Sequence, residues 1–170
     1  MDLHRFLAAS AIAGGLLRIV NAFTADVLNP QMLQLAYALT DVLLLLGLAG
    51  LLLTWRDELE RLGYAGVAVT AIGLAIIRAM AFTPMAMGGY MIGATVALIG
   101  VALLAAELLW RHIGSRITPL LWIAAFVLGV WSAFGGQAAL RTLAGIAFGA
   151  GFAVVGIDLL LQRPRVAEHA

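Results

Sequence analysis

Six ionisable side chains stand inside long apolar stretches of this chain, and their chemistry needs an explanation. They are Arg18, Asp41, Arg78, Glu107, Arg141 and Asp158. A charged side chain near the middle of a bilayer costs about 2.5 kcal/mol or more, and it is retained with a partner, with water or with a function. Three of the six are basic and three are acidic, which indicates either ion pairs or a polar site inside a membrane.

Asp41 is the most deeply placed of these side chains. It lies about nine residues beyond the start of its apolar stretch, or about 13 Å along an α-helix. Gln34, Tyr37 and Asp41 recur at i, i+3 and i+7 and therefore share one helix face. Arg18, with Asn21 beside it on the preceding helix, is the expected partner of Asp41. The pair is either a structural ion pair that holds two helices in register or the centre of a ligand or transport site.

The arginines Arg18, Arg78 and Arg141 lie within about two turns of the same predicted membrane face. As a ring around a central axis they would attract anions or lipid phosphate. The simpler interpretation is that each guanidinium reaches the headgroup region separately. Arg141 fits a ring least well, because it lies nearest the end of its apolar stretch.

The two remaining acids lie about one helical turn from the opposite face. Glu107 and Arg111 are spaced i, i+4 in the favourable order, which predicts an ion pair at a helix end. Asp158 is expected to be hydrated or close to Arg163 or Arg165. Both acids are secondary candidates for a functional site.

The elements that must position these side chains are membrane-spanning helices. The chain is 64% hydrophobic and 11% charged, with a mean hydropathy of +1.05, too apolar for the surface of a soluble domain. A span needs about 20 apolar residues. Six such segments are predicted, at about residues 6–23, 32–55, 62–82, 89–110, 117–134 and 140–161. We therefore expect a single all-α domain over residues 1–170, with lipid as its main surroundings.

The basic residues predict how the spans are oriented. All ten are arginine, a composition typical of GC-rich bacteria, and this favours a bacterial inner membrane. If the spans alternate, seven arginines outside them fall on one side, and the loops on the other side contain none. The positive-inside rule then predicts that both termini are cytoplasmic. Trp55 and Trp110 directly precede arginines and are expected at the interface.

The spans also indicate an internal repeat of three helical hairpins. Each first helix ends in Ala-Phe, at Phe23, Phe82 and Phe134, and each second helix ends just before an arginine. Such repeats are common in transporters. The alternative is that any tandem of apolar hairpins would look similar.

Two segments carry a resemblance to a known group of proteins. "LLRIVNAF", followed by "LTDVLLLLGLAGLLLTWRDELERLG", resembles small bacterial six-helix integral membrane proteins to which no activity is assigned. The resemblance covers most of the chain. It implies the six-helix fold and brings no catalytic motif with it.

Several function classes lack the residues they need. There is no cysteine and no lysine, which excludes disulfides, thiolate sites and lysine Schiff bases. The three histidines lie outside the spans, so no haem, metal or other cofactor is expected, and no basic cluster indicates nucleic acid. Hydrolase and metalloprotease motifs are missing as well, which argues against an enzyme.

Small residues predict close helix contacts. Gly89-x-x-x-Gly93 and Gly145-x-x-x-Gly149 would allow helices to approach closely, either within the chain or between subunits of an oligomer or a partner complex. The leading functional hypothesis is a small-solute or ion transporter, or a channel-like protein, centred on Arg18 and Asp41. The alternative is a structural or accessory subunit that binds another membrane protein.

Overall fold

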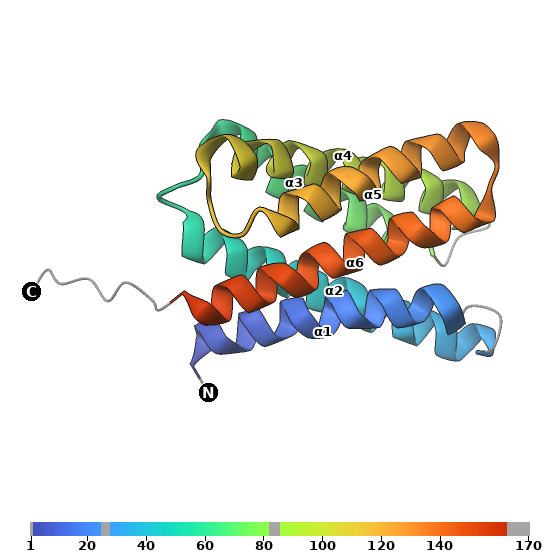
Figure 1. Ribbon diagram of the computed structural model, residues 1–170. Coiled ribbons are helices and arrows are strands. Elements are labelled where there is room, and N and C mark those ends of the chain that lie inside the picture. The colour runs from blue at the N-terminus through green and yellow to red at the C-terminus, as the bar shows by residue number, and fades with distance from the viewer. Residues whose placement is uncertain (1, 25–27, 82–85, 163–170) are drawn as a thin grey trace, which may run out of the picture.

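The computed structural model describes residues 2–24, 28–81 and 86–162 and consists of helices and short connections (Figure 1). The helices are α1 (Leu3–Thr24), α2 (Pro30–Trp55), α3 (Arg61–Met80), α4 (Ala86–Arg111), α5 (Ile117–Gly135) and α6 (Ala138–Leu161). Each of the six is long and apolar enough to cross a membrane. The prediction of an all-α fold with six helices that are long and apolar enough to span a membrane is therefore confirmed.

Local sequence signals fix several helix ends. The side chain of Asn29 accepts a hydrogen bond from the backbone N–H of Met32 at 2.9 Å, and Pro30 follows as the first residue of α2. At the end of α5, Gly136 adopts a left-handed conformation with φ 63°, and its N–H donates to the carbonyl of Ser132. Short connections of this kind make consecutive helices antiparallel.

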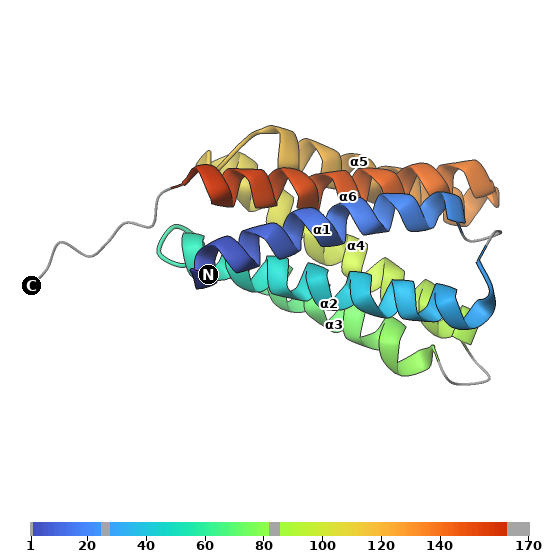
Figure 2. The same ribbon diagram turned by 90° about the horizontal axis from the view of Figure 1, so that it is seen from below.

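The helices form a closed ring in which the last helix returns to the first (Figures 1 and 2). Helix α1 packs closely against both α2 and α6, α3 packs most closely against α4, and α5 lies between α4 and α6. The contact between α2 and α3 is slight. We call the end with the α1–α2, α3–α4 and α5–α6 connections the outer end and the opposite end the inner end. Since α1 packs against α6 as well as α2, the arrangement is not three separate hairpins, and the threefold repeat stays a prediction.

Glycines bring two pairs of helices into backbone contact. A Cβ atom at Gly100 of α4 would lie 2.3 Å from the backbone nitrogen of Thr70 in α3. A Cβ atom at Gly15 of α1 would lie 2.4 Å from the carbonyl oxygen of Gly149 in α6. Because real Cβ contacts are never this short, any larger residue would push these helices apart. The α3–α4 and α1–α6 pairs are thus locked by shape and dispersion, as is usual between helices in a membrane.

The four glycines predicted to mediate helix contacts do so inside the chain. Gly89 and Gly93 face α3, where Met80 and Ile77 lie against them. Gly149 faces α1, and the guanidinium of Arg18 covers Gly145. The within-chain interpretation is therefore confirmed. The faces of these glycines are already occupied within the chain, and contacts with other subunits or partner proteins stay a prediction.

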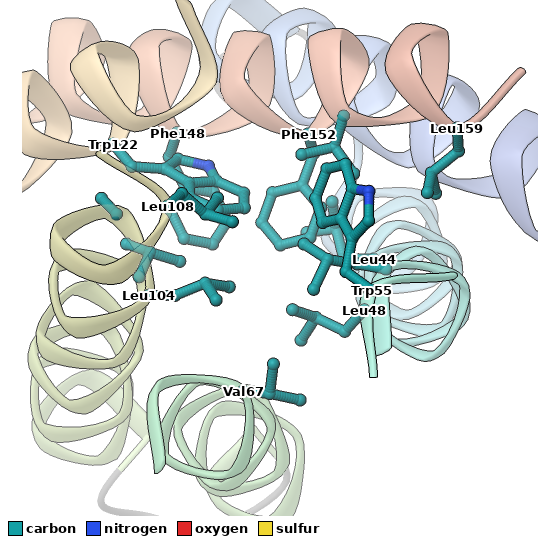
Figure 3. Packing of buried hydrophobic residues seen from close by; sticks show 14 of the residues in the cluster. Leu44, Leu48, Trp55, Val67, Leu104, Leu108, Trp122, Phe148, Phe152 and Leu159 are labelled. Carbon is teal, nitrogen blue, oxygen red and sulfur yellow. The ribbon is translucent and has the colours of Figure 1, made fainter. Parts of the chain in front are cut away.

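The inner half of the ring is filled by apolar side chains (Figure 3). Trp55 from α2, Leu104 from α4, Trp122 from α5 and Phe152 from α6 converge there, and each is no more than 1% exposed. The rings of Trp122 and Phe152 lie 5.2 Å apart and are tilted, a favourable arrangement for aromatic pairs. This apolar cluster fills the centre of the inner half, and the polar side chains of Glu107 and Thr118 are also buried there, near the inner end.

Candidate functional site

The outer half of the ring contains an ion pair between α2 and α3. The Nε atom of Arg78 donates to Oδ2 of Asp41 at 2.8 Å. The guanidinium also donates to the backbone carbonyl of Gln34 at 3.4 Å. Asp41 is 7% exposed, so Arg78 supplies the compensating charge that a carboxylate at this depth requires. The prediction that Arg18 is the partner of Asp41 is wrong.

Arg18 has a different set of neighbours. Its Nη2 atom donates to the hydroxyl oxygen of Tyr90 at 3.2 Å. Its Cζ atom lies 6.0 Å from the centre of the Tyr37 ring, near the limit of a cation–π contact. Its guanidinium is also close to Gly145 of α6. Arg18 therefore touches three other helices, and no carboxylate within the described ranges comes within ion-pair distance of it.

The Arg18–Tyr90 hydrogen bond crosses the interior of the ring. Helices α1 and α4 make no backbone contact anywhere in the described parts of the chain. The long side chain of Arg18 bridges that distance and reaches the outer turns of α4. Both polar links, Arg18–Tyr90 and Asp41–Arg78, join the α3–α4 pair to α1 and α2.

Asn21 and Thr40 form a separate polar contact between α1 and α2. Asn21 Nδ2 donates to Thr40 Oγ1 at 2.9 Å, and Thr40 Oγ1 donates to the carbonyl of Ala36 at 2.8 Å. Asn21 and Thr40 are 2% and 0% exposed. Asn21 was predicted to belong to the ligand site, but it is buried in a helix interface and is placed to hold α1 against α2.

Arg141, the third arginine of the predicted ring, lies apart from Arg18 and Arg78. Arg141 is exposed on α6, whereas Arg18 and Arg78 are partly buried. It makes no ion pair with any residue that the structure describes. The three arginines therefore do not form a ring, and Arg141 fits the simpler interpretation of a side chain that reaches the headgroup region alone.

At the inner end, Glu107 caps a helix. Its carboxylate accepts hydrogen bonds from the backbone N–H groups of Glu60 and Gly63, at the start of α3. A carboxylate at this position satisfies free N–H groups and interacts favourably with the helix dipole. Arg111 pairs with the side chain of Glu60. The predicted Glu107–Arg111 ion pair is wrong, because a better set of donors for Glu107 comes from the neighbouring helix.

Asp158 also binds backbone, in the connection between α4 and α5. Its Oδ2 atom accepts from the N–H of Ser115 at 3.0 Å, next to Gly114, which has φ 64°. The alternative partners Arg163 and Arg165 lie outside the described residues. Glu107 and Asp158 thus both serve as structural acceptors for connections at the inner end.

The two tryptophans predicted at the interface differ. Trp55 is 1% exposed, and its Nε1 donates to Gln162 Oε1 at 2.6 Å. The indole of Trp55 packs into the apolar cluster and does not face outward, and its position at the interface stays a prediction. Trp110 is 86% exposed, as an interfacial residue should be.

Tyr90 is the site residue that sequence reasoning missed. It lies about one turn into α4, and it shares no helix face with any of the charged residues used to predict the site. Tyr90 is 38% exposed, and its hydroxyl contacts Arg18. Only the path of α4 across the ring from α1 connects it to Arg18.

The outer cluster consists of Arg18, Tyr37, Asp41, Arg78 and Tyr90. Its charged members are Arg18, Arg78 and Asp41, which sum to one positive charge. Tyr37 and Tyr90 add hydroxyl groups. Within the described ranges, no three His, Cys, Asp or Glu side chains come together as a metal site would require. A half-buried guanidinium without an acidic partner is suited to hold an anionic or polar ligand.

Comparison of the chain with protein-family models, with curated proteins and with solved structures finds no match.

Proposed function

We propose that this chain is a multi-pass membrane transporter for a small solute or ion, and that the outer cluster of Arg18, Tyr37, Asp41, Arg78 and Tyr90 is its binding site. One observation carries the proposal. Arg18 holds a positive charge inside the helical ring, where its contacts with described residues are the hydroxyl of Tyr90, the ring of Tyr37 and Gly145, and none of these is an acid. Such a charge costs up to about 2.5–3.5 kcal/mol on insertion scales, the value for the centre of a membrane helix. A purely structural role would be filled at lower cost by an apolar side chain.

The two halves of the ring favour a transporter over an open channel. A solute that reaches Arg18 from the outer end meets the apolar cluster around Trp122 and Phe152 before it can reach the inner end. Passage then requires the helices to move. The slight α2–α3 contact is a suitable seam for such movement, since the α3–α4 pair is tightly packed within itself.

We further propose a bacterial inner membrane with cytoplasmic termini, as the arginine distribution indicates. The chain lacks cysteine, so single cysteines can be introduced at the exposed Gln137 and at Ser115, at opposite ends of the bundle. In intact cells, a membrane-impermeant maleimide should label the cysteine at 137 and not the one at 115. The reverse labelling would invert the orientation and place the arginine-rich end outside.

The alternative of an accessory subunit relies on the glycine faces and on the apolar exterior. The glycine faces of α4 and α6 are filled by α3 and α1 of the same chain, so the apolar exterior is the surface left for such a partner. The transport proposal draws instead on polar groups that packing alone leaves unexplained.

The proposal is tested with purified protein in liposomes. Charge movement is recorded on a solid-supported membrane after jumps in the concentration of anionic, cationic and zwitterionic solutes, and uptake of labelled neutral solutes is followed in parallel. We expect a saturable response to one class, its loss in Arg18→Gln, and its retention in Arg141→Gln. Arg141→Gln is a matched control, because it removes the same charge from an exposed site near the same end. Identical responses from both variants and the wild type would refute the proposal.

A further inference from the structure

We propose that the ligand of the outer cluster is a small anion with a single negative charge, held between Arg18 and Tyr90. The inference rests on the proposed binding site, and it names the chemical class that the site takes. It does not require that the ligand be transported.

The charge balance of the cluster selects the charge of the ligand. Asp41 neutralises Arg78 through the 2.8 Å ion pair, and Arg18 is left with one positive charge. A monovalent anion brings the cluster to zero, which is the favoured state in surroundings of low dielectric constant. A divalent anion or a cation would leave net charge inside the ring.

The hydrogen-bonding groups around Arg18 fit an anion. A guanidinium has five N–H donors, and the described residues accept from Arg18 only through Tyr90. The hydroxyl of Tyr90 accepts from Arg18, so its own proton remains available to a ligand. The flat fork of the guanidinium together with this hydroxyl suits a carboxylate or another planar oxoanion.

The surroundings set the route and limit the size of the ligand. Tyr90 is 38% exposed near the outer end, and a ligand would approach Arg18 from this side. Gly145 lies against the guanidinium, where a Cβ atom would be 3.7 Å from Nη2. Below Arg18 the interior becomes apolar, so a charged ligand stays in the outer half. These limits favour a compact anion over an extended one.

Two sources could supply this chemistry, because a free oxoanion and a phosphodiester lipid headgroup each carry one negative charge. The distinction can be made by experiment, since only the lipid source depends on the composition of the bilayer.

The test measures binding by calorimetry and by thermal stability in an uncharged maltoside detergent. The probes are sodium acetate, sodium nitrate and sodium sulfate, with a bulky sulfonate as the balancing anion. Tetramethylammonium and glucose serve as the cationic and neutral probes. We expect acetate or nitrate to bind and stabilise the wild type, with sulfate weaker. Arg18→Gln should weaken binding about tenfold or more, and Tyr90→Phe, at a partly exposed position that tolerates the change, by about threefold.

A second arm repeats the titration in nanodiscs of phosphatidylcholine with and without phosphatidylglycerol. Loss of acetate binding when phosphatidylglycerol is present supports the site with a lipid headgroup as its occupant. Unchanged binding supports it with a free anion.

The inference is overturned if sulfate, tetramethylammonium or glucose binds more tightly than the monovalent anions. It is also overturned if neither Arg18→Gln nor Tyr90→Phe changes the affinity. Its failure is distinct from that of the proposed function. Arg18-dependent anion binding without flux would refute the transporter proposal and keep the anion site. Arg18-dependent flux of a cation or a neutral solute would refute the anion site and keep the transporter proposal.

Discussion

The Asp41–Arg78 pair offers the sharpest test of the structure, because the sequence alone favours Arg18 as the partner. The two single variants should differ in stability. In Arg78→Gln, a carboxylate that is 7% exposed loses its partner. In Asp41→Asn, the guanidinium of Arg78 keeps the Gln34 carbonyl at 3.4 Å and can extend toward the outer headgroups.

The expected magnitudes follow from this asymmetry. Removing one partner of a buried ion pair costs about 3–5 kcal/mol, and the lower end applies here because the Arg78 side chain is 24% exposed. We therefore expect Arg78→Gln to lower the free energy of unfolding by about 3 kcal/mol. Asp41→Asn should lower it by about 1–2 kcal/mol, since an arginine near a helix end reaches water more easily than a buried acid does. The double variant should recover about 2 kcal/mol relative to the sum of the two.

The assay is reversible unfolding in mixed micelles of a mild detergent and dodecyl sulfate, followed by tryptophan fluorescence. The control is a second double-mutant cycle, made from Arg18→Gln and Asp41→Asn. Its coupling free energy should be small because Arg18 binds Tyr90 instead. Equal stability of Arg78→Gln and the wild type would refute the reasoning. So would a larger coupling in the Arg18 cycle than in the Arg78 cycle.

The remaining predictions concern the helix contacts. Gly100→Ala should destabilise the protein by about 1–3 kcal/mol, since its Cβ would lie 2.3 Å from the nitrogen of Thr70. Gly88→Ala on the same helix meets nothing within 4 Å and should be neutral or stabilising, and equal losses in the same assay would contradict this packing. Glu107→Ala should cost about 1–3 kcal/mol and speed hydrogen exchange in the first turn of α3, because two backbone N–H groups lose their acceptor. The control Glu58→Ala changes an exposed side chain, and equal exchange in the two variants would exclude the cap.

The site could be predicted from the sequence only in part. The depth of Asp41 and the positions of Arg18 and Arg78 within apolar stretches follow from hydropathy and helix geometry, and all three belong to the outer cluster. Tyr90 gave no signal, because a tyrosine near a helix end is as common at the membrane interface as in a binding site. The wrong pairings have a common cause. Sequence spacing favours partners on the same helix or on the preceding helix, whereas Glu107 and Arg78 bind groups on helices whose positions depend on tertiary packing.

The sequence by itself determined the number of helices, their approximate ends and their apolar character. These depend on runs of about 20 apolar residues and on local caps such as Asn29-Pro30, which need no knowledge of distant contacts. The tertiary structure decided which charges meet. Lateral packing sets that choice, because glycine-lined pairs such as Gly15–Gly149 fix which helices are neighbours and how they are rotated. Once those contacts are formed, Arg78 is directed to Asp41, and Arg18 is directed across the ring to Tyr90.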